Sequence, residues 1–322
     1  MSLVNKEYEG VLSQMKLIYK SAAALVVGVL AIAGCGANSD PTAQDTTEQT
    51  SKPAKDTIAV GSANFPESAL LAEIYAGALK AKGVEVTTKL NIGSREAYLG
   101  GLQDGSIDLV PEYTGNLLQY YDKKATAKTA DEVFAALPAA LPDKLIVLDK
   151  SPAEDKDAVV VTKATADKYN LKSIADLVPV QNDITLGGPP EWRSRANGVP
   201  GLKSVYGLDF SQRFKPLDVA GPQTVLALKN NQVQAGNLFT TQSAIAQNGF
   251  VVLDDPKNLF LPQNVVPLIN KAKASDNVKA ALNAVSAELD TPKLAELVKE
   301  VEVDKKEPAA VAESWLTESG LK

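Results

Sequence analysis

From Thr57 onward the sequence alternates between short apolar runs and longer amphipathic runs, and this alternation constrains the fold more than any other feature. Leu70, Ile74 and Leu79 recur at helical spacing, and Gly83 follows them as a helix cap. The elements expected in this part are strands at 57–61, 84–90 and 107–110 and helices at 66–82 and 95–104. Strands that alternate with helices predict an α/β architecture with a parallel or mixed sheet.

A second series with the same alternation follows, and the chain then becomes helical to its end. The elements expected are helices at 173–177, 201–206 and 222–231, strands at 184–186, 214–217, 233–239 and 251–253, and final helices at 277–288, 291–301 and 307–318. Pro292 and Pro308 stand where prolines open helices.

The length of this part of the chain favours two lobes over a single core. We predict one lobe from residues 57–157 plus 266–322 and a second lobe from residues 158–265. Extended segments near 157–162 and 263–269 would cross between them as a two-segment hinge.

The composition excludes several classes of function. The sequence has no histidine, so the commonest general base and metal ligand is absent. It has one cysteine, so at most one thiol nucleophile is available. A formal net charge of −6 without a basic block argues against a nucleic-acid partner. We therefore expect no catalysis, no metal and no cofactor.

The single cysteine, Cys35, ends an apolar stretch at 21–33 that follows Lys16 and Lys20. A basic start, a short apolar middle and small residues before a cut site describe a secretory signal, and the stretch is too short to span a membrane. Its end resembles a bacterial lipobox, which implies cleavage before Cys35 and acyl chains that anchor the protein to a membrane. We predict a signal peptide at 1–34, with translation starting at Met15, and a flexible tether at 35–56.

Polar or Gly/Pro-rich segments follow four of the expected strands, at 61–67, 111–116, 187–195 and 239–242. Each carries an aromatic residue near a hydrogen-bonding side chain. Parallel α/β lobes bind ligands at the carboxyl ends of their strands, so these segments are the expected binding site.

Five ordered blocks then resemble one family, the glycine betaine/carnitine/choline-binding proteins of osmoprotectant ABC importers. The blocks are Val60–Phe65, Asp104–Gly115, Leu186–Glu191, Gly201–Leu208 and Leu238–Thr241. The resemblance implies a type II periplasmic-binding-protein-like fold and a monomeric receptor on the extracytoplasmic face of the membrane. It also implies delivery of a quaternary ammonium solute to a permease, with ATP hydrolysed by a separate subunit.

A trimethylammonium group has no N–H to donate, so aromatic faces select it instead of hydrogen bonds. The residues that the resemblance and the loop positions assign to the ligand are Tyr113, Arg195, Asn116, Phe239, Trp192, Asn64, Phe65, Phe214 and Thr240. Among them, the resemblance makes Tyr113 a cage tyrosine, Asn116 a donor to a ligand carboxylate and Arg195 an arginine that reaches across from the second lobe.

Two positions depart from the family pattern, because Ala63 and Gln242 stand where relatives commonly have Lys and Asp. Loss of that lysine weakens the grip on a ligand carboxylate. The residues alone leave other readings open: the aromatic side chains could fill the core, and Asn64 and Asn116 could cap helices. The fold could also bind an amino acid or another small metabolite, and a surface-anchored enzyme or a scaffolding lipoprotein are the remaining rivals.

Overall fold

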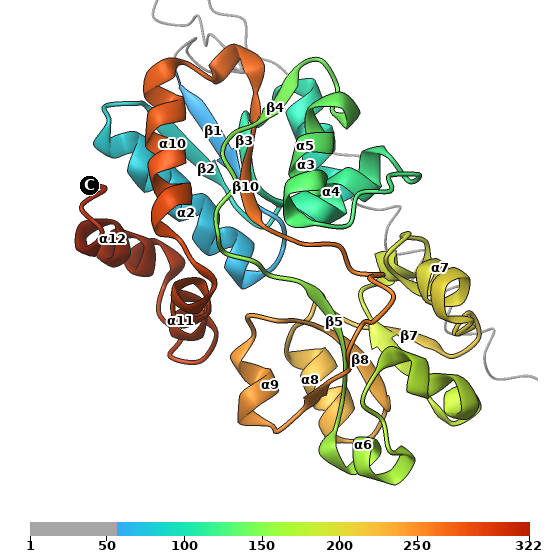
Figure 1. Cartoon of the computed structure of the whole chain (residues 1–322). Helices are drawn as coiled ribbons and strands as arrows, with labels where there is room; N and C mark the ends of the chain where they lie inside the picture. Colours follow the sequence, from blue (N-terminus) through green and yellow to red (C-terminus); the bar gives the residue numbers. More distant parts are fainter. Residues whose placement is uncertain (1–56) are drawn as a thin grey trace, which may run out of the picture. The chain divides into compact units, whose positions relative to one another are not determined.

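The computed structural model describes residues 57–322, which form two five-stranded sheets and the helices that pack on them. The predicted signal peptide, Cys35 and the tether lie outside the described residues. Figure 1 shows the first sheet in blue and green with an orange strand, and the second sheet in green to orange. We call each sheet, with its helices, a lobe.

The first sheet has the order β2-β1-β3-β10-β4. Its strands are β1 (Ile58–Gly61), β2 (Val86–Lys89), β3 (Leu109–Tyr113), β4 (Leu145–Val147) and β10 (Val265–Asn270). The pairs β1–β2 and β1–β3 are parallel, whereas β10 runs antiparallel to both β3 and β4. The sheet is therefore mixed, because β10 runs opposite to its two neighbours.

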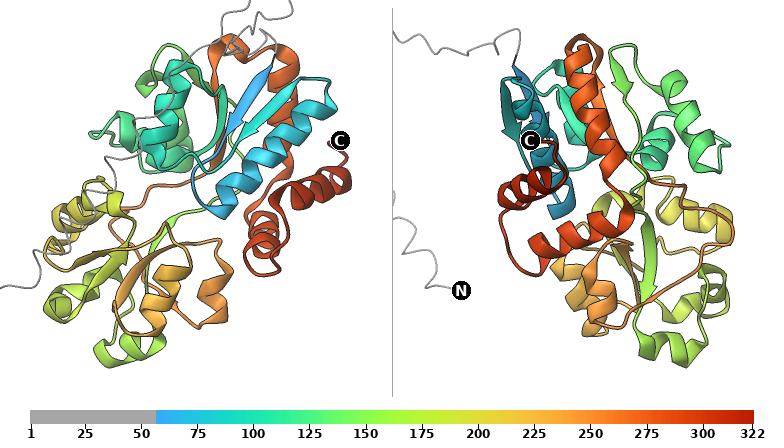
Figure 2. Two further views of the ribbon diagram at one scale, coloured as in Figure 1. Left: turned by 180° about the vertical axis from the view of Figure 1, so that it is seen from behind. Right: turned by 60° about the vertical axis from the view of Figure 1, so that its left-hand side comes forward.

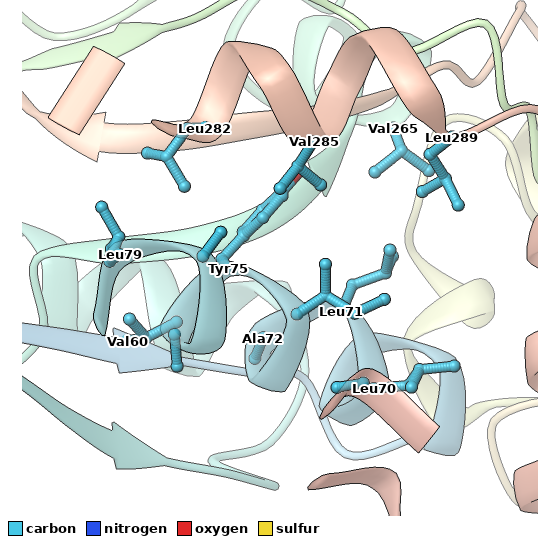
Figure 3. Packing of buried hydrophobic residues seen from close by; sticks show 14 of the residues in the cluster. Val60, Leu70, Leu71, Ala72, Tyr75, Leu79, Val265, Leu282, Val285 and Leu289 are labelled. Carbon is cyan, nitrogen blue, oxygen red and sulfur yellow. The ribbon is translucent and has the colours of Figure 1, made fainter. Parts of the chain in front are cut away.

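Helices cover this sheet on both faces. They are α2 (Pro66–Ala81), α3 (Arg95–Asp104), α4 (Thr114–Tyr121), α5 (Ala130–Ala140), α10 (Asp276–Glu288), α11 (Thr291–Glu302) and α12 (Pro308–Glu318). Figure 3 shows Leu71 and Tyr75 of α2 pointing toward Val285 and Leu289. All four side chains are at most 1% exposed, so α2 is the buried centre of the first lobe.

The second sheet has the order β7-β6-β8-β5-β9. Its strands are β5 (Asp157–Val161), β6 (Leu186–Gly188), β7 (Phe214–Pro216), β8 (Ala235–Phe239) and β9 (Val251–Val252). The α-helices of this lobe are α6 (Lys163–Tyr169), α7 (Val199–Gly201), α8 (Pro222–Lys229) and α9 (Ser243–Gln247). Residues 57–322 also contain the 3-10 helices η1 (Ile174–Asp183), η2 (Pro190–Arg193) and η4 (Lys271–Lys273) and the π-helix η3 (Leu202–Tyr206). This sheet is also mixed, since β5 runs antiparallel to β8 and β9 while β6 is parallel to β7 and β8.

Two stretches of chain connect the sheets, one before β5 and one before β10. They meet in an antiparallel bridge between Glu154 and Asn264, and the Asp155 amide donates to the Gln263 carbonyl at 3.1 Å. Figure 2 shows the two stretches passing between the sheets together. The segments expected to cross, 157–162 and 263–269, largely coincide with β5 and β10, and the two stretches meet just before these strands. The exact lobe boundaries stay a prediction.

The most consequential error of the sequence analysis concerns β3. The segment 111–116 was expected to be a loop after a strand ending at Val110, but the strand continues to Tyr113 and α4 begins at Thr114. Pro111 faces Pro267 of β10 at a position between the hydrogen-bonded pairs, so neither proline removes a hydrogen bond between β3 and β10. This pairing keeps a proline-containing segment in the middle of the sheet.

Other elements differ less. The helices expected at 95–104 and 307–318 lie within one residue of the observed α3 and α12, and Pro308 opens its helix as expected. The helix expected at 201–206 is a short α-turn followed by a π-segment, and the one at 173–177 is a longer 3-10 helix. Helices α4, α5, α6 and α9 and strand β4 were not expected.

Truncation of a buried leucine of α2 tests the packing of the first lobe. We expect Leu71→Ala to lower the free energy of unfolding by about 2–5 kcal/mol, because the side chain is fully buried and leaves a cavity. The same change at Leu226 of α8, which is 54% exposed, should stay within about 0.5 kcal/mol. Urea denaturation measures both, and similar losses in the two variants would contradict this description of the core.

Candidate functional site

A cavity with about 650 Å³ of empty space, counted out to its mouth, lies between the two lobes. The first lobe contributes the turn after β1, the start of α3 and the end of β3. The second lobe contributes the segment entering β5, the turn after β6 and the end of β8. The residues that line it are Ala63, Asn64, Phe65, Ser68, Ser94, Arg95, Tyr98, Pro111, Tyr113, Asn116, Asp155, Asp157, Pro189, Glu191, Trp192, Arg195, Val219, Asn237 and Phe239.

Seven of the nine residues assigned from the sequence line this cavity. They are Tyr113, Arg195, Asn116, Phe239, Trp192, Asn64 and Phe65. Phe214 and Thr240 do not line it. Phe214 is packed in the core of the second lobe, and the Thr240 hydroxyl donates to Asp155 and accepts from the Lys156 amide.

Three of the lining rings form one aromatic cluster that draws on both lobes. Phe65 precedes α2, and its ring centroid lies 5.3 Å from that of Phe239 on β8 and 6.2 Å from that of Tyr113 on β3. Tilted rings at these distances expose π-faces to whatever lies beside them. The cluster therefore offers electron-rich surface at the seam between the lobes.

Trp192 serves the core and the cavity wall together. It is 1% exposed and stacks on Phe260 with ring centroids 6.0 Å apart. The chain folds back closely behind it, because a Cβ at Gly198 would lie 2.1 Å from the Trp192 carbonyl oxygen. This close approach holds the turn that carries Arg195 against the cavity wall.

Asp157, at the start of β5, is the centre of a buried amide network. Its Oδ2 accepts hydrogen bonds from Asn116 (3.0 Å) and Asn197 (2.8 Å), and its Oδ1 accepts one from Asn237 (3.0 Å). Asn116 belongs to α4 of the first lobe, and its Oδ1 also accepts from Asn197. The network thus connects the lobes directly, and Asn116 does not cap a helix.

Both arginines of the cavity are already bound to protein carboxylates. Arg95 makes a bidentate pair with Glu112, at 2.8 and 2.9 Å, and Tyr98 donates to the same carboxylate at 2.6 Å. Burial alone would lower the pKa of Arg95, but the charge and hydrogen bonds of Glu112, together with Tyr98 and Asp157, outweigh it and raise the pKa. The pairing therefore favours the charged form of this buried guanidinium.

Arg195, in the turn after β6, reaches the first lobe as the resemblance implies. Its guanidinium pairs with both oxygens of Glu96 on α3, at 3.2 and 2.9 Å. Although burial opposes it, the hydrogen bond from Arg195 lowers the pKa of Glu96 to about 2. The contact is a bidentate link between the lobes.

A further link between the lobes passes through a buried carboxyl group. The Glu67 carboxyl, 3% exposed, accepts hydrogen bonds from the hydroxyls of Tyr113 (2.6 Å) and Thr241 (2.7 Å), the latter from the second lobe. Burial raises the pKa of Glu67 to about 7. Burial and the neighbouring Glu67 also raise the pKa of Asp155 well above its usual range. Two buried acids side by side share a proton more readily than they share two negative charges.

The two departures from the family pattern take different places. Ala63 lines the cavity, so no ammonium group projects from this position. The Gln242 side chain instead donates to the Ala220 carbonyl and, at 3.4 Å, to Glu302 of α11. Ala63 is thus part of the cavity wall, whereas Gln242 contributes to the packing between the lobes.

The structure also brings to the cavity residues that the sequence analysis missed as ligand candidates, chiefly Asp155, Asp157, Glu191 and Asn237. Asn237 lies within β8 and Asp157 begins β5, so neither stands in a segment that follows a strand. A polar residue inside an apolar strand, such as Asn237, was the available signal.

Within residues 57–322 no cluster of three or more histidine, cysteine, aspartate or glutamate side chains is arranged to hold a metal ion. The same residues include no helix whose length and apolar character would carry it across a membrane.

The buried Glu67 carboxyl predicts a specific pH dependence. A carboxyl whose folded-state pKa lies above its ordinary value of 4.5 stabilises the fold most below pH 4.5 and loses this contribution as the pH rises through about 7. Glu67→Gln mimics the protonated form and removes that loss. The free energy of unfolding of the variant, relative to the original chain, should therefore rise between pH 5 and 8. Parallel pH profiles of the two proteins in urea denaturation would refute a raised pKa at Glu67.

Comparison with known proteins places this cavity in context. A family model described as the substrate binding domain of an ABC-type glycine betaine transport system matches residues 56–318. The glycine betaine-binding protein YehZ of Escherichia coli strain K12 is 27% identical over 277 residues, covering 82% of this chain and 90% of the relative. The carnitine transport binding protein OpuCC of Listeria monocytogenes is 26% identical over 269 residues, covering 81% of this chain and 86% of the relative.

Solved structures agree on the fold. A structure titled as a glycine betaine/carnitine/choline ABC transporter superposes with a TM-score of 0.64 at 24% identity, covering 82% of this chain and 99% of the other. A choline binding protein in complex with choline gives a TM-score of 0.61 at 14% identity, covering 82% of this chain and 89% of the other. With its two mixed sheets the chain has the type II periplasmic binding protein fold, and it belongs to the family of substrate binding domains of ABC-type glycine betaine transport systems.

Proposed function

We propose that this chain captures a small quaternary ammonium solute in the cavity between its lobes and delivers it to a membrane permease. The observation that carries the proposal is the gathering of Phe65, Tyr113 and Phe239 from both lobes around a cavity that also contains buried carboxyls. Methylated cations bind aromatic faces with about 0.5–2 kcal/mol per ring when water is excluded. The lining offers that surface.

The same cavity argues against an amino acid as the ligand. An α-carboxylate is bound most strongly by a guanidinium or ammonium group that is free to pair with it. Arg95 and Arg195 are the cations of the lining within the part of the chain described, and each is paired with a glutamate of the protein. An amino acid would have to displace one of these pairs, whereas a cation leaves both in place.

Contacts across the seam support a receptor that closes on its ligand. Arg195 binds Glu96, Thr241 donates to Glu67, and the Asp157 network joins the lobes behind the cavity. Within residues 57–322, closure has to bend the two connecting stretches beside Glu154 and Asn264. A hinge with contacts formed only in the closed state makes the loaded receptor distinct from the empty one.

The cellular arrangement that we propose follows from the sequence. The lipobox-like segment supports a signal peptide at 1–34 and acyl chains on Cys35, with residues 35–56 as a tether. The receptor would act as a monomer on the extracytoplasmic face of the membrane, with the permease and its ATPase as separate subunits. Lobes at 57–157 plus 266–322 and at 158–265 complete the proposed organisation.

Isothermal titration calorimetry of the purified full chain tests the proposal. Choline, glycine betaine and carnitine serve as ligands, with an amino acid such as arginine as the comparison. We expect heat from at least one of the three methylated compounds and none from arginine. Binding of arginine alone would refute the proposed solute class.

Replacement of one ring tests the aromatic surface. Phe65→Leu keeps most of the apolar volume but removes the π-face, so affinity for the bound methylated cation should fall by about 2- to 30-fold. Phe134→Leu makes the same change in α5, away from the cavity lining, and should leave the affinity unchanged. Equal affinities of the two variants in titration calorimetry would show that the ring at position 65 does not bind the cation.

A further inference from the structure

Two acceptor atoms of the cavity residues have no hydrogen-bond donor among residues 57–322. They are Oδ1 of Asn237 and Oε2 of Glu191, and both atoms are buried. Buried polar atoms in folded proteins nearly always have a partner, so an orphaned acceptor beside a binding cavity needs an explanation. A ligand that carries a hydrogen-bond donor for the amide oxygen and a positive charge for the carboxylate supplies one.

The orientation of the Asn237 amide is determined by its surroundings. The residue is fully buried, and its Nδ2 donates to Asp157 at 3.0 Å. The reverse orientation would place the amide oxygen against a carboxylate oxygen, and neither atom could donate. Oδ1 is therefore the polar atom of this side chain that the protein leaves for another molecule.

The charges of the lining point to a ligand without a carboxylate. The positive charges of Arg95 and Arg195 are neutralised by Glu112 and Glu96. The carboxyls that remain belong to Asp155, Asp157 and Glu191. A ligand carboxylate in this place would meet acidic groups and no free cation, whereas a positive group would be attracted.

Resting on the proposed function, we infer that the ligand is a quaternary ammonium cation that bears a hydroxyl group and no carboxylate. Asn237 Oδ1 accepts the hydrogen bond of the hydroxyl, and Glu191 supplies negative charge to the methylated ammonium group. Glycine betaine has neither the donor nor the net positive charge, so it binds more weakly. Asn237 is accordingly the residue that sets specificity within the family's range of solutes.

Matched ligands separate the hydroxyl from the rest of the cation. Choline and its O-methyl ether, (2-methoxyethyl)trimethylammonium, carry the same charge and the same three methyl groups, but only choline donates. Titration calorimetry on the full chain should give an affinity for choline on the order of tenfold higher than for the ether, because the ether leaves Oδ1 unpaired. Glycine betaine should also bind more weakly than choline.

Two asparagine variants assign the effect to a residue. Asn237→Ala should bring the ratio of the choline and ether affinities to within about twofold, since the acceptor is gone. Asn197→Ala removes a hydrogen bond to the same Asp157 but leaves Asn237 Oδ1 in place, so its ratio should match the original chain. Because the readout is a ratio, a general loss of closure in either variant cancels.

Each outcome decides the inference. An ether or glycine betaine that binds the original chain as tightly as choline overturns it, and this comparison needs no variant. A ratio that survives in Asn237→Ala, or collapses equally in Asn197→Ala, overturns the assignment to Asn237. Absence of heat with every quaternary ammonium compound would instead refute the proposed function on which the inference rests.

Discussion

Ionisable groups buried at the seam between the lobes need partners there, and the lobes supply many of these partners to one another. The buried carboxyls of Glu67 and Asp157 accept from Thr241 and Asn116 of the opposite lobe, and at the more exposed edge of the seam Arg195 of the second lobe binds Glu96 of the first. An unpaired buried charge is far more costly than an exposed one. The arrangement of the lobes seen here therefore depends on satisfying these groups together.

The same requirement shapes the cavity. The protein satisfies its own arginines internally and leaves carboxyls and aromatic faces on the wall, which together form an environment for a cation. Phe65 and Phe239 come from different lobes, so a cation that contacts both rings would stabilise closure as well as bind. In the proposed function, recognition and closure would therefore use the same side chains.

Much of the fold could be predicted from the sequence, because helical spacing in α2 and α3 and the prolines of α11 and α12 act locally. The central strands could not be placed from local patterns. Pro111 within β3 is tolerated only because β10, about 150 residues later, pairs with it at a position that needs no N–H.

The site was predictable to a similar extent. Residues in turns after strands, such as Phe65 and Trp192, were found because that position is general to α/β folds. Asp155 and Asp157 were missed because their place at the cavity depends on where the two connecting stretches meet. The contact of Arg195 with the first lobe was expected from the family resemblance. Its partner Glu96 was not, because it lies 99 positions earlier in the chain.

A crystal structure of the full chain grown with choline would test the central claim most directly. The account predicts the trimethylammonium group against the rings of Phe65 and Phe239, with Arg95 and Arg195 still bound to their glutamates. Choline bound outside the seam, or a cavity in which either arginine has left its glutamate to contact the ligand, would contradict it.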